Sequence, residues 1–458
     1  MMASRNTLDM TNGPIFRKLL LYAYPLILNG VINTLYGVAD KIIAGQFIGD
    51  NAMAAVGICT PPIGLIFNTI VSVASGVGVL CGNFIGARKD TELRECMHTT
   101  PLTGAIIGLL MGILGFVLTT PLLVVTNTPE SVFSDAYTYM VVRMLGLPFA
   151  IANTFCNNIL TAHGDTKRIT FSGIVSGLLN VAANIVFVTI IPWGVAGIAF
   201  ATVLSQILPF LIKIYILFSP KDCYRLKFSE MKIRWKYIKQ IFSIGIPTGM
   251  NSLAFSFANM MLQSSVNTFG PTIIAGNACA DTLINLVAMI PTHMNSACSC
   301  AVAQCYGAKN FQRIKDTVNK GIIGTNIMIA IVSVIVTIFA RPVLRLFTDN
   351  PDVATAGIPK MMFSIWGYLI YNFVMVYGGA LKGMRRSSTM MILNFLGICL
   401  PRLLWIWFVF PFFSTPNILY LIYPISYVTS AIPTYFAYHR ILKKQLLLHQ
   451  QNTSTEIT

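Results

Sequence analysis

The chain has 458 residues, of which 55% are apolar and only 10% are charged, and its mean hydropathy is +0.69. Soluble domains carry about 25% charged residues, and a soluble fold of this composition would expose more apolar surface than water tolerates. The composition excludes an ordinary cytoplasmic enzyme, a disordered chain and a secreted disulfide scaffold. The net charge of +16 is spread over short loops between apolar segments, which favours contact with lipid head groups over nucleic-acid binding.

Twelve apolar segments are predicted to cross the membrane, which takes about 20 residues for a helix. They lie near residues 16–47, 51–82, 97–122, 132–161, 169–191, 195–218, 238–266, 272–303, 318–340, 355–381, 388–412 and 417–440. The first segment is too long and lacks the cleavage-like end of a signal peptide, so we interpret it as a retained helix. The predicted fold class is therefore an all-α integral membrane protein with twelve transmembrane helices.

Basic residues fall on alternate loops between these segments, from Arg17 before the first to Lys443 after the last. The intervening loops hold almost none, and the exceptions are Arg341, Arg345 and Lys360. By the positive-inside rule, both termini and the long middle loop face the cytoplasm. A missed or an additional helix would disrupt the alternation, which supports the count of twelve.

The sequence repeats itself at a spacing of about 220 residues. Pro25 reappears as Pro247, and Gly86-Ala87-Arg88 reappears as Gly307-Ala308-Lys309. Two halves with an even number of spans insert the same way up, as in carriers that rock two lobes about a central site. The predicted organisation is an N-terminal six-helix lobe at 1–218, a cytoplasmic linker at 219–236, a C-terminal six-helix lobe at 237–445 and a cytoplasmic tail at 446–458.

Acidic side chains are rare inside the predicted spans, because each costs about 2.5–3.5 kcal/mol at mid-membrane on insertion scales. Only Asp40 and Asp281 lie well inside. Asp40 closes a polar face of the first span, on which Asn29, Asn33 and Tyr36 precede it at spacings of three and four residues.

Helix geometry predicts that Asp40 meets polar residues of two other spans. Counting about 1.5 Å per residue from the outer ends places Asp40, Asn184 of the fifth span and Thr202 of the sixth at a similar depth. These oxygen atoms could bind Na⁺ together, or the Asp40 carboxyl could carry a proton. The alternative is a hydrogen-bonded clamp between helices, which is common in membranes. We favour the functional interpretation, because an acid converges with several amides.

The second half offers a different polar set. Asn277, Asp281 and Asn285 share one face of the eighth span, and Asn259 and Gln263 line part of the seventh. No acid occurs at the position that repeats Asp40, so the two halves differ chemically. Asp281 is either a counter-charge for a cationic substrate or a structural residue, and the sequence leaves both interpretations open.

Other residues within the spans give weaker signals. Arg143 and Arg402 either pair with acids or extend to the interface. His293 lies near three cysteines, but their spacing is not a recognised ligand pattern. We therefore predict no metal beyond Na⁺ at Asp40.

Four features of the first half, together with their echo in the second, resemble one transporter family. They are the helix from Pro25 to Asp40, Gly86-Ala87-Arg88, Gly164-Asp165-Thr166-Lys167, and the segment from Gly194 to Thr202. With these features the chain resembles, over nearly its whole length, the bacterial multidrug and toxic compound extrusion (MATE) transporters. The resemblance implies two six-helix lobes in the bacterial plasma membrane that export amphiphilic organic cations in exchange for H⁺ or Na⁺.

The resemblance also implies a cation-coupling site in the N-terminal lobe. The matching positions are Asp40, Asn180 and Thr202, with Asn153 and Asn157 nearby. The family often has Asp at the position of Asn184. The loss of one carboxylate weakens the electrostatic attraction for Na⁺, so the coupling ion stays open between H⁺ and Na⁺.

The sequence thus predicts a secondary active efflux transporter that works by alternating access. The candidate substrate-binding residues are Tyr36, Asn33, Asn259, Gln263, Asn277, Asp281 and Asn285. No phosphate-binding loop or nucleophile elbow occurs in the sequence. We expect no enzyme activity, no cofactor besides the coupling ion, partners limited to small organic cations and membrane lipid, and a functional monomer.

Two alternatives fit the sequence less well than this transporter. A lipid-linked oligosaccharide flippase of the same superfamily should line its cavity with several Arg or Lys residues, and few basic residues lie within the predicted spans. A membrane receptor without transport is disfavoured by the internal duplication and the lack of a signalling domain in the sequence.

Overall fold

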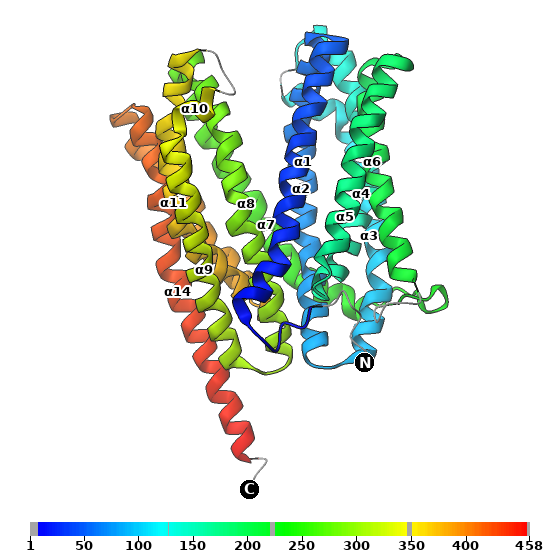
Figure 1. Ribbon diagram of the computed structural model, residues 1–458, viewed down its shortest axis with the longest axis vertical. Helices are drawn as coiled ribbons and strands as arrows, with labels where there is room; N and C mark the ends of the chain where they lie inside the picture. Colours follow the sequence, from blue (N-terminus) through cyan, green and yellow to red (C-terminus); the bar gives the residue numbers. More distant parts are fainter. Residues whose placement is uncertain (1–7, 127, 220–224, 346–349, 456–458) are drawn as a thin grey trace. The chain divides into compact units, whose positions relative to one another are not determined.

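The computed structural model describes residues 8–126, 128–219, 225–345 and 350–455, where every regular element is a helix (Figure 1). Eleven helical segments of this part are long and apolar enough to cross a membrane. The twelfth predicted span is the first part of α14 (Pro416–Thr455), where two prolines and several tyrosines interrupt the apolar stretch. The protein is an all-α integral membrane protein with twelve transmembrane helices in two six-helix lobes, as predicted.

The first six spans are formed by α1 to α6. Their bounds are Ile15–Ile43 (α1), Asp50–Gly86 (α2), Asp90–Val125 (α3), Glu130–Ala162 (α4), Thr166–Ile185 (α5) and Gly194–Phe218 (α6). α1 and α5 each continue into one π-helical turn, at Ala44–Ile48 and Val186–Ile190. The helices α3 to α6 run alongside one another (Figure 1).

The second six spans begin with α7, and the fifth of them is irregular. The regular spans are Trp235–Val266 (α7), Pro271–Gly307 (α8), Phe311–Ile338 (α9), Pro351–Gly383 (α11) and α14. A short helix, α10 (Ala340–Arg345), follows α9. The irregular span comprises α12 (Ser387–Asn394), a π-helical turn at Phe395–Cys399, α13 (Leu400–Leu404) and a second π-helical turn at Trp405–Val409. α11 packs against α8, α9 and α14 (Figure 1).

The chain divides into two compact units. We call the unit built mainly from Tyr24–Ile85 and Lys89–Gly249 the N-terminal lobe. The C-terminal lobe comprises Met10–Ala23, Gly86–Arg88 and Met250–Thr458. The first turns of α1 therefore belong to the C-terminal lobe, and the first half of α7 belongs to the N-terminal lobe. The boundaries at 218, 236 and 445, which follow loops in the sequence, stay a prediction.

Both halves carry the same turn after their second span. Arg88 and Lys309 occupy equivalent positions of the repeat, and both have left-handed backbone angles, with φ of 54° and 56°. Long side chains adopt this conformation rarely, so its recurrence shows that the repeated sequence forms the same local structure twice. Gly86 in the first copy lies so close to the backbone of Gln304 that a side chain there would overlap it.

The Gly164-Asp165-Thr166-Lys167 motif forms the start of α5. Gly164 adopts a φ of +75°, and the Asp165 side chain caps the helix by accepting a hydrogen bond from the backbone N–H of Arg168 at 3.4 Å. A carboxylate at this position satisfies a free helix donor and complements the helix dipole. Asn310 caps α9 in the same way, through the N–H of Arg313 at 3.0 Å.

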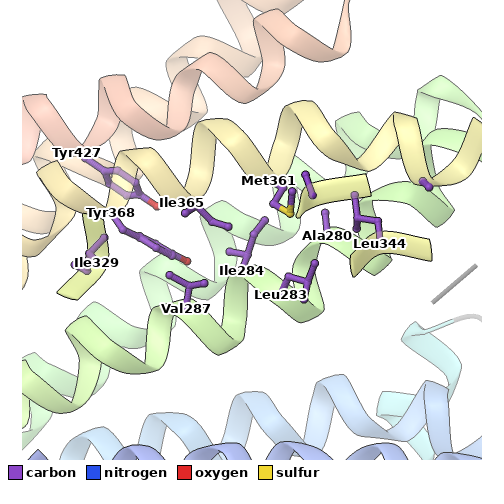
Figure 2. Packing of buried hydrophobic residues seen from close by; sticks show 12 residues of the cluster. Ala280, Leu283, Ile284, Val287, Ile329, Leu344, Met361, Ile365, Tyr368 and Tyr427 are labelled. Carbon is purple, nitrogen blue, oxygen red and sulfur yellow. The ribbon is translucent and has the colours of Figure 1, made fainter. Parts of the chain in front are cut away.

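The core of the C-terminal lobe lies between α8 and α11 (Figure 2). Leu283, Ile284 and Val287 of α8 pack against Met361 and Ile365 of α11. Spacings of three and four residues on each helix place these side chains on one face. Their burial fixes the positions of the polar residues that α8 and α11 carry on adjoining faces.

Candidate functional site

Asp40 lies on α1 in the N-terminal lobe, and its carboxylate accepts a hydrogen bond from a buried amide of α5. Asn184 Nδ2 donates to Asp40 Oδ1 at 2.5 Å and to Asn180 Oδ1 at 3.3 Å. Both asparagines are buried, whereas Asp40 is half-buried. Their spacing of four residues puts the two amides on one face of α5. The structure thus brings together three of the residues that the sequence analysis selected for cation coupling.

The same cluster holds an oxygen atom that suits a small cation. Asn184 Oδ1 is buried and has no hydrogen-bond partner among the described residues. A buried amide oxygen without a partner is costly, so it has the capacity to accept a proton donor or to bind a cation. The Asn184 N–H group points to Asp40. Joint binding of Na⁺ by Asp40 and Asn184 therefore requires the amide to turn, whereas protonation of the second Asp40 oxygen does not.

Thr202 and the two asparagines of α4 are not bonded to Asp40. The Thr202 hydroxyl donates to the Ile198 carbonyl of its own helix at 2.9 Å. Asn153 Oδ1 accepts a hydrogen bond of 2.7 Å from Lys213 Nζ, a buried lysine of α6. Asn157 Oδ1 is buried and has no hydrogen-bond partner among the described residues.

Arg143 of α4 provides a positive charge near Asp40 and interacts with it electrostatically. Its guanidinium lines a cavity of about 180 Å³ within the N-terminal lobe, together with side chains from α2, α4 and α6. The other lining residues are Thr60, Ile63, Gly64, Phe67, Tyr139, Leu147 and Gln206. Pockets for drug-sized ligands measure about 300–1,000 Å³, so this cavity is sized for a small ion or a few water molecules.

Tyr36 and Asn33, the substrate-binding candidates of α1, have different surroundings. The Tyr36 ring packs over Gly177 of α5, where a side chain would overlap it, and its hydroxyl donates to the Ile174 carbonyl at 3.4 Å. The Asn33 side chain is exposed. Tyr36 is therefore part of the α1–α5 contact, and Asn33 lies on the surface of the lobe.

Asp281 of α8 forms an ion pair within the C-terminal lobe. Lys360 Nζ lies 2.7 Å from Asp281 Oδ2. The alternation of basic loops assigned Lys360 to an outer loop, but the residue lies ten positions into α11 and is buried. Asp281 thus has an internal counter-charge, which weakens its candidacy as the partner of a cationic substrate.

The other polar candidates of the C-terminal lobe are divided between buried pairs and exposed positions. Asn277 and the Tyr420 hydroxyl of α14 exchange hydrogen bonds of 2.7 and 2.9 Å. Asn259 Oδ1 accepts a hydrogen bond from Arg402 Nη1 at 2.7 Å. Gln263 donates to Asn267, and Asn285 is exposed.

His293 and the neighbouring cysteines do not form a metal site in the described part of the chain. No group of three or more His, Cys, Asp or Glu side chains there could hold a metal ion. The thiols of Cys298, Cys300 and Cys305 are buried, and buried thiols pack as small apolar groups.

Two lysines are buried although the sequence analysis did not predict them as interior residues. Lys213 lies inside the apolar segment 195–218, and Lys360 lies inside 355–381. The signal that could have indicated their burial was a basic residue within an apolar segment. Both lie near a predicted helix end, where a lysine normally extends to the interface, and only the tertiary contacts show that they are buried.

Comparison with known proteins assigns the chain to a transporter family. The sequence model of the MatE family matches residues 25–186 and 247–407, which together exceed half of the chain. The chain belongs to the MATE family. The two matches begin at Pro25 and Pro247, so they reproduce the repeat found in the sequence.

Individual MATE relatives match along most of their length. The chain is 24% identical to the probable multidrug resistance protein YoeA of Bacillus subtilis, over 94% of this chain and 95% of that protein. It is also 24% identical to the probable multidrug resistance protein NorM of Thermotoga maritima, with 87% of each chain covered. A solved MOP superfamily transporter from Pyrococcus furiosus superimposes with a TM-score of 0.89 at 20% identity, over 96% of this chain and 99% of that one. This likeness shows the same fold.

Proposed function

We propose that the protein is a secondary active multidrug efflux transporter that exchanges amphiphilic organic cations for H⁺ or Na⁺ by alternating access. It would act as a monomer in the bacterial plasma membrane, with both termini in the cytoplasm. The observation that carries the proposal is the Asp40 carboxylate in a MATE-family chain. It lies on the apolar helix α1 and accepts a hydrogen bond from Asn184 of α5. The multidrug names of the bacterial relatives support the substrate class.

Competition for Asp40 would enforce the exchange. A charged carboxylate within a membrane span is unfavourable without a bound cation or proton, so Asp40 would bind either the coupling ion or a departing organic cation. Exchange of one monovalent cation for another moves no net charge. It would draw on the chemical gradient of the ion, about 1.4 kcal/mol per tenfold ratio, and not on the about 2.3 kcal/mol per charge that 100 mV supplies.

The surroundings of Asp40 support H⁺ over Na⁺ as the coupling ion. Protonation needs one carboxylate oxygen, whereas Na⁺ needs several oxygen ligands at once. Asn184 presents its N–H to the carboxylate, and Arg143 adds a positive charge nearby. Both features oppose binding of Na⁺ at Asp40 more than they oppose formation of a neutral carboxyl group.

Reconstitution in liposomes tests the proposal. A pH gradient and a Na⁺ gradient are imposed separately while export of a fluorescent organic cation is followed. We expect the pH gradient alone to drive export, and Asp40→Asn to abolish it. The matched control is Asp135→Asn, which removes a half-buried acid of α4 that forms no hydrogen bond or ion pair with the described residues. Export driven by neither gradient would refute the transporter, and normal export by Asp40→Asn would refute the assigned site.

One observation supports the flippase as a second candidate function. Arg143, Lys213, Lys360 and Arg402 all lie within helices that span the membrane, which is more interior basic residues than the sequence analysis counted. A pyrophosphate-linked lipid requires such charges. The flippase interpretation predicts movement of a lipid-linked oligosaccharide between leaflets of the same liposomes, without any ion gradient.

A further inference from the structure

We propose that the C-terminal lobe contains a binding site for amphiphilic aromatic carboxylates, with the Arg402 guanidinium as its anion-binding group. The inference rests on the proposed function only in treating the bound compound as a transported substrate. It adds organic anions to the organic cations proposed above.

Arg402 lies in the most irregular span of the protein. It belongs to α13, which has π-helical turns on both sides, at Phe395–Cys399 and Trp405–Val409. A π-helical turn inserts an extra residue into a helix, disturbs the regular hydrogen bonds and is found frequently at functional sites. The two turns keep the span continuous while they set the direction in which Arg402 points.

The Arg402 side chain is fully buried and has only neutral hydrogen-bond partners. Nη1 donates to Asn259 Oδ1 at 2.7 Å, and Nε donates to Ser426 Oγ at 3.2 Å. Nη2 is buried and has no hydrogen-bond partner among the described residues. No described carboxylate lies within ion-pair distance of the guanidinium. A buried charge normally requires an opposite charge, so this guanidinium has an unmet capacity for an anion.

Asp281, an acid within a span of the same lobe, is unavailable to meet this requirement. Asp281 is paired with Lys360 at 2.7 Å. The charges of that pair compensate each other, and Arg402 remains as an uncompensated positive charge in the interior of the lobe. An arriving carboxylate would neutralise it.

Aromatic rings surround the guanidinium and provide walls for an apolar ligand. The Arg402 guanidinium carbon lies 5.0 Å from the ring centre of Phe255, 5.1 Å from that of Tyr423 and 5.6 Å from that of Tyr427. Tyr371 extends this wall, with its ring 4.6 Å from Tyr427 and 6.4 Å from Phe255. Cation–π contacts of this kind stabilise the charge in part and leave the hydrogen-bonding requirement of Nη2 open.

The residues around Arg402 differ in exposure. Arg402 and Ser426 are buried, whereas Phe255, Asn259 and Tyr423 are half-buried. Tyr427, at the edge of this site, packs beside Tyr368 in the core shown in Figure 2. Tyr427 therefore joins Arg402 to the packed core, and a ligand would approach past the half-buried rings of Phe255 on α7 and Tyr423 on α14.

This arrangement matches one ligand chemistry. A carboxylate would accept hydrogen bonds from Arg402 Nη2, which has no partner among the described residues, and from the amide N–H group of the neighbouring Asn259. The aromatic body of the ligand stacks against Phe255 and Tyr423. Guanidinium groups favour such planar anions because their N–H groups lie in one plane.

A series of three naphthalene compounds of similar size tests the site. Purified full-length protein in detergent is dialysed to equilibrium against 2-naphthoate, neutral 2-naphthamide or the cation 2-naphthylmethylammonium. We expect 2-naphthoate to bind at least tenfold more tightly than the amide, which corresponds to about 1.4 kcal/mol. Arg402→Gln should reduce this ratio to less than twofold.

The matched control is Lys382→Gln, which removes a positive charge from α11 in the same lobe, away from the aromatic rings. It should keep the tenfold ratio. If Arg402→Gln does not yield folded protein, Arg402→Lys keeps the charge without the planar N–H groups and should lower the ratio at least threefold. Equal binding of naphthoate and amide by the wild type, or a ratio that survives both substitutions of Arg402, overturns the proposal. Binding is measured without an ion gradient, so failure of export in liposomes would leave this result standing.

Discussion

The ion pair between Asp281 and Lys360 makes an asymmetric prediction for stability. The Lys360 side chain is only 5% exposed, whereas that of Asp281 is 43% exposed. Removal of one partner costs about 3–5 kcal/mol when the survivor stays buried and unpaired. Asp281→Ala leaves such a buried ammonium, so we expect a loss of about 3 kcal/mol in the free energy of unfolding. Lys360→Met leaves the more exposed partner unpaired, so we expect a smaller loss than for Asp281→Ala.

The free energy of unfolding is measured by denaturant titration of the detergent-solubilised protein, followed by circular dichroism. Asp281→Ala combined with Lys360→Met should recover most of the loss caused by Asp281→Ala, because an apolar methionine replaces the stranded charge. Asp352→Ala, at an exposed position in the first turn of α11, is the control for removal of an acid. Equal losses for the two single variants, or a larger loss for Lys360→Met, would refute the reasoning.

Three further predictions concern other parts of the structure. Burial lowers the pKa of His163, in the turn after α4, from its ordinary 6.5 to about 4. The unfolded chain therefore binds a proton that the folded state excludes. The free energy of unfolding should fall by up to about 3 kcal/mol as the pH drops from about 6.5 to 4. His163→Gln should flatten the dependence of the thermal midpoint on pH. Gly177→Ala places a methyl group where the Tyr36 ring lies and should lower the unfolding free energy by about 1–3 kcal/mol. In the Tyr36→Ala variant, the same Gly177→Ala substitution should cause no further loss. Arg313 donates three hydrogen bonds of 2.7–2.9 Å to the carbonyls of Met10, Asn12 and Gly13, so Arg313→Ala should accelerate amide hydrogen exchange in that segment, and an unchanged rate would show that other contacts hold it.

The helices and the duplication could be predicted because they depend on composition and spacing. Apolar length located the spans, and the two copies of Gly-Ala followed by a basic residue marked the turn that recurs with left-handed φ at Arg88 and Lys309. The π-helical turns around Arg402 could not be predicted, because an inserted residue leaves the hydrophobicity of a span unchanged. The last span was predicted as apolar although its prolines and tyrosines reduce its hydropathy.

The candidate site was predictable where helix depth alone decides proximity. Counting residues along α1 and α5 placed Asp40 beside Asn184, and the two side chains are 2.5 Å apart. Depth does not specify rotation about the helix axis. Thr202 lies on α6 at a similar depth, and its hydroxyl bonds to its own helix at Ile198. For the same reason, the pairing of Asn153 with Lys213 required the tertiary structure.

The basic residues of the interior show why an acid-centred search of the sequence was incomplete. The cost of burying a charge does not depend on its sign, but a lysine or arginine near a helix end can extend to water, so sequence position alone does not reveal its burial. Lys213 and Arg402 are both buried and both bonded to neutral amides. An amide dipole solvates an ammonium or guanidinium group less completely than a carboxylate does. Each lobe therefore keeps an interior positive charge bonded to an amide, Lys213 in the N-terminal lobe and Arg402 in the C-terminal lobe. The charge of the compounds that bind to each lobe is the measurement that distinguishes transport of cations from transport of aromatic carboxylates.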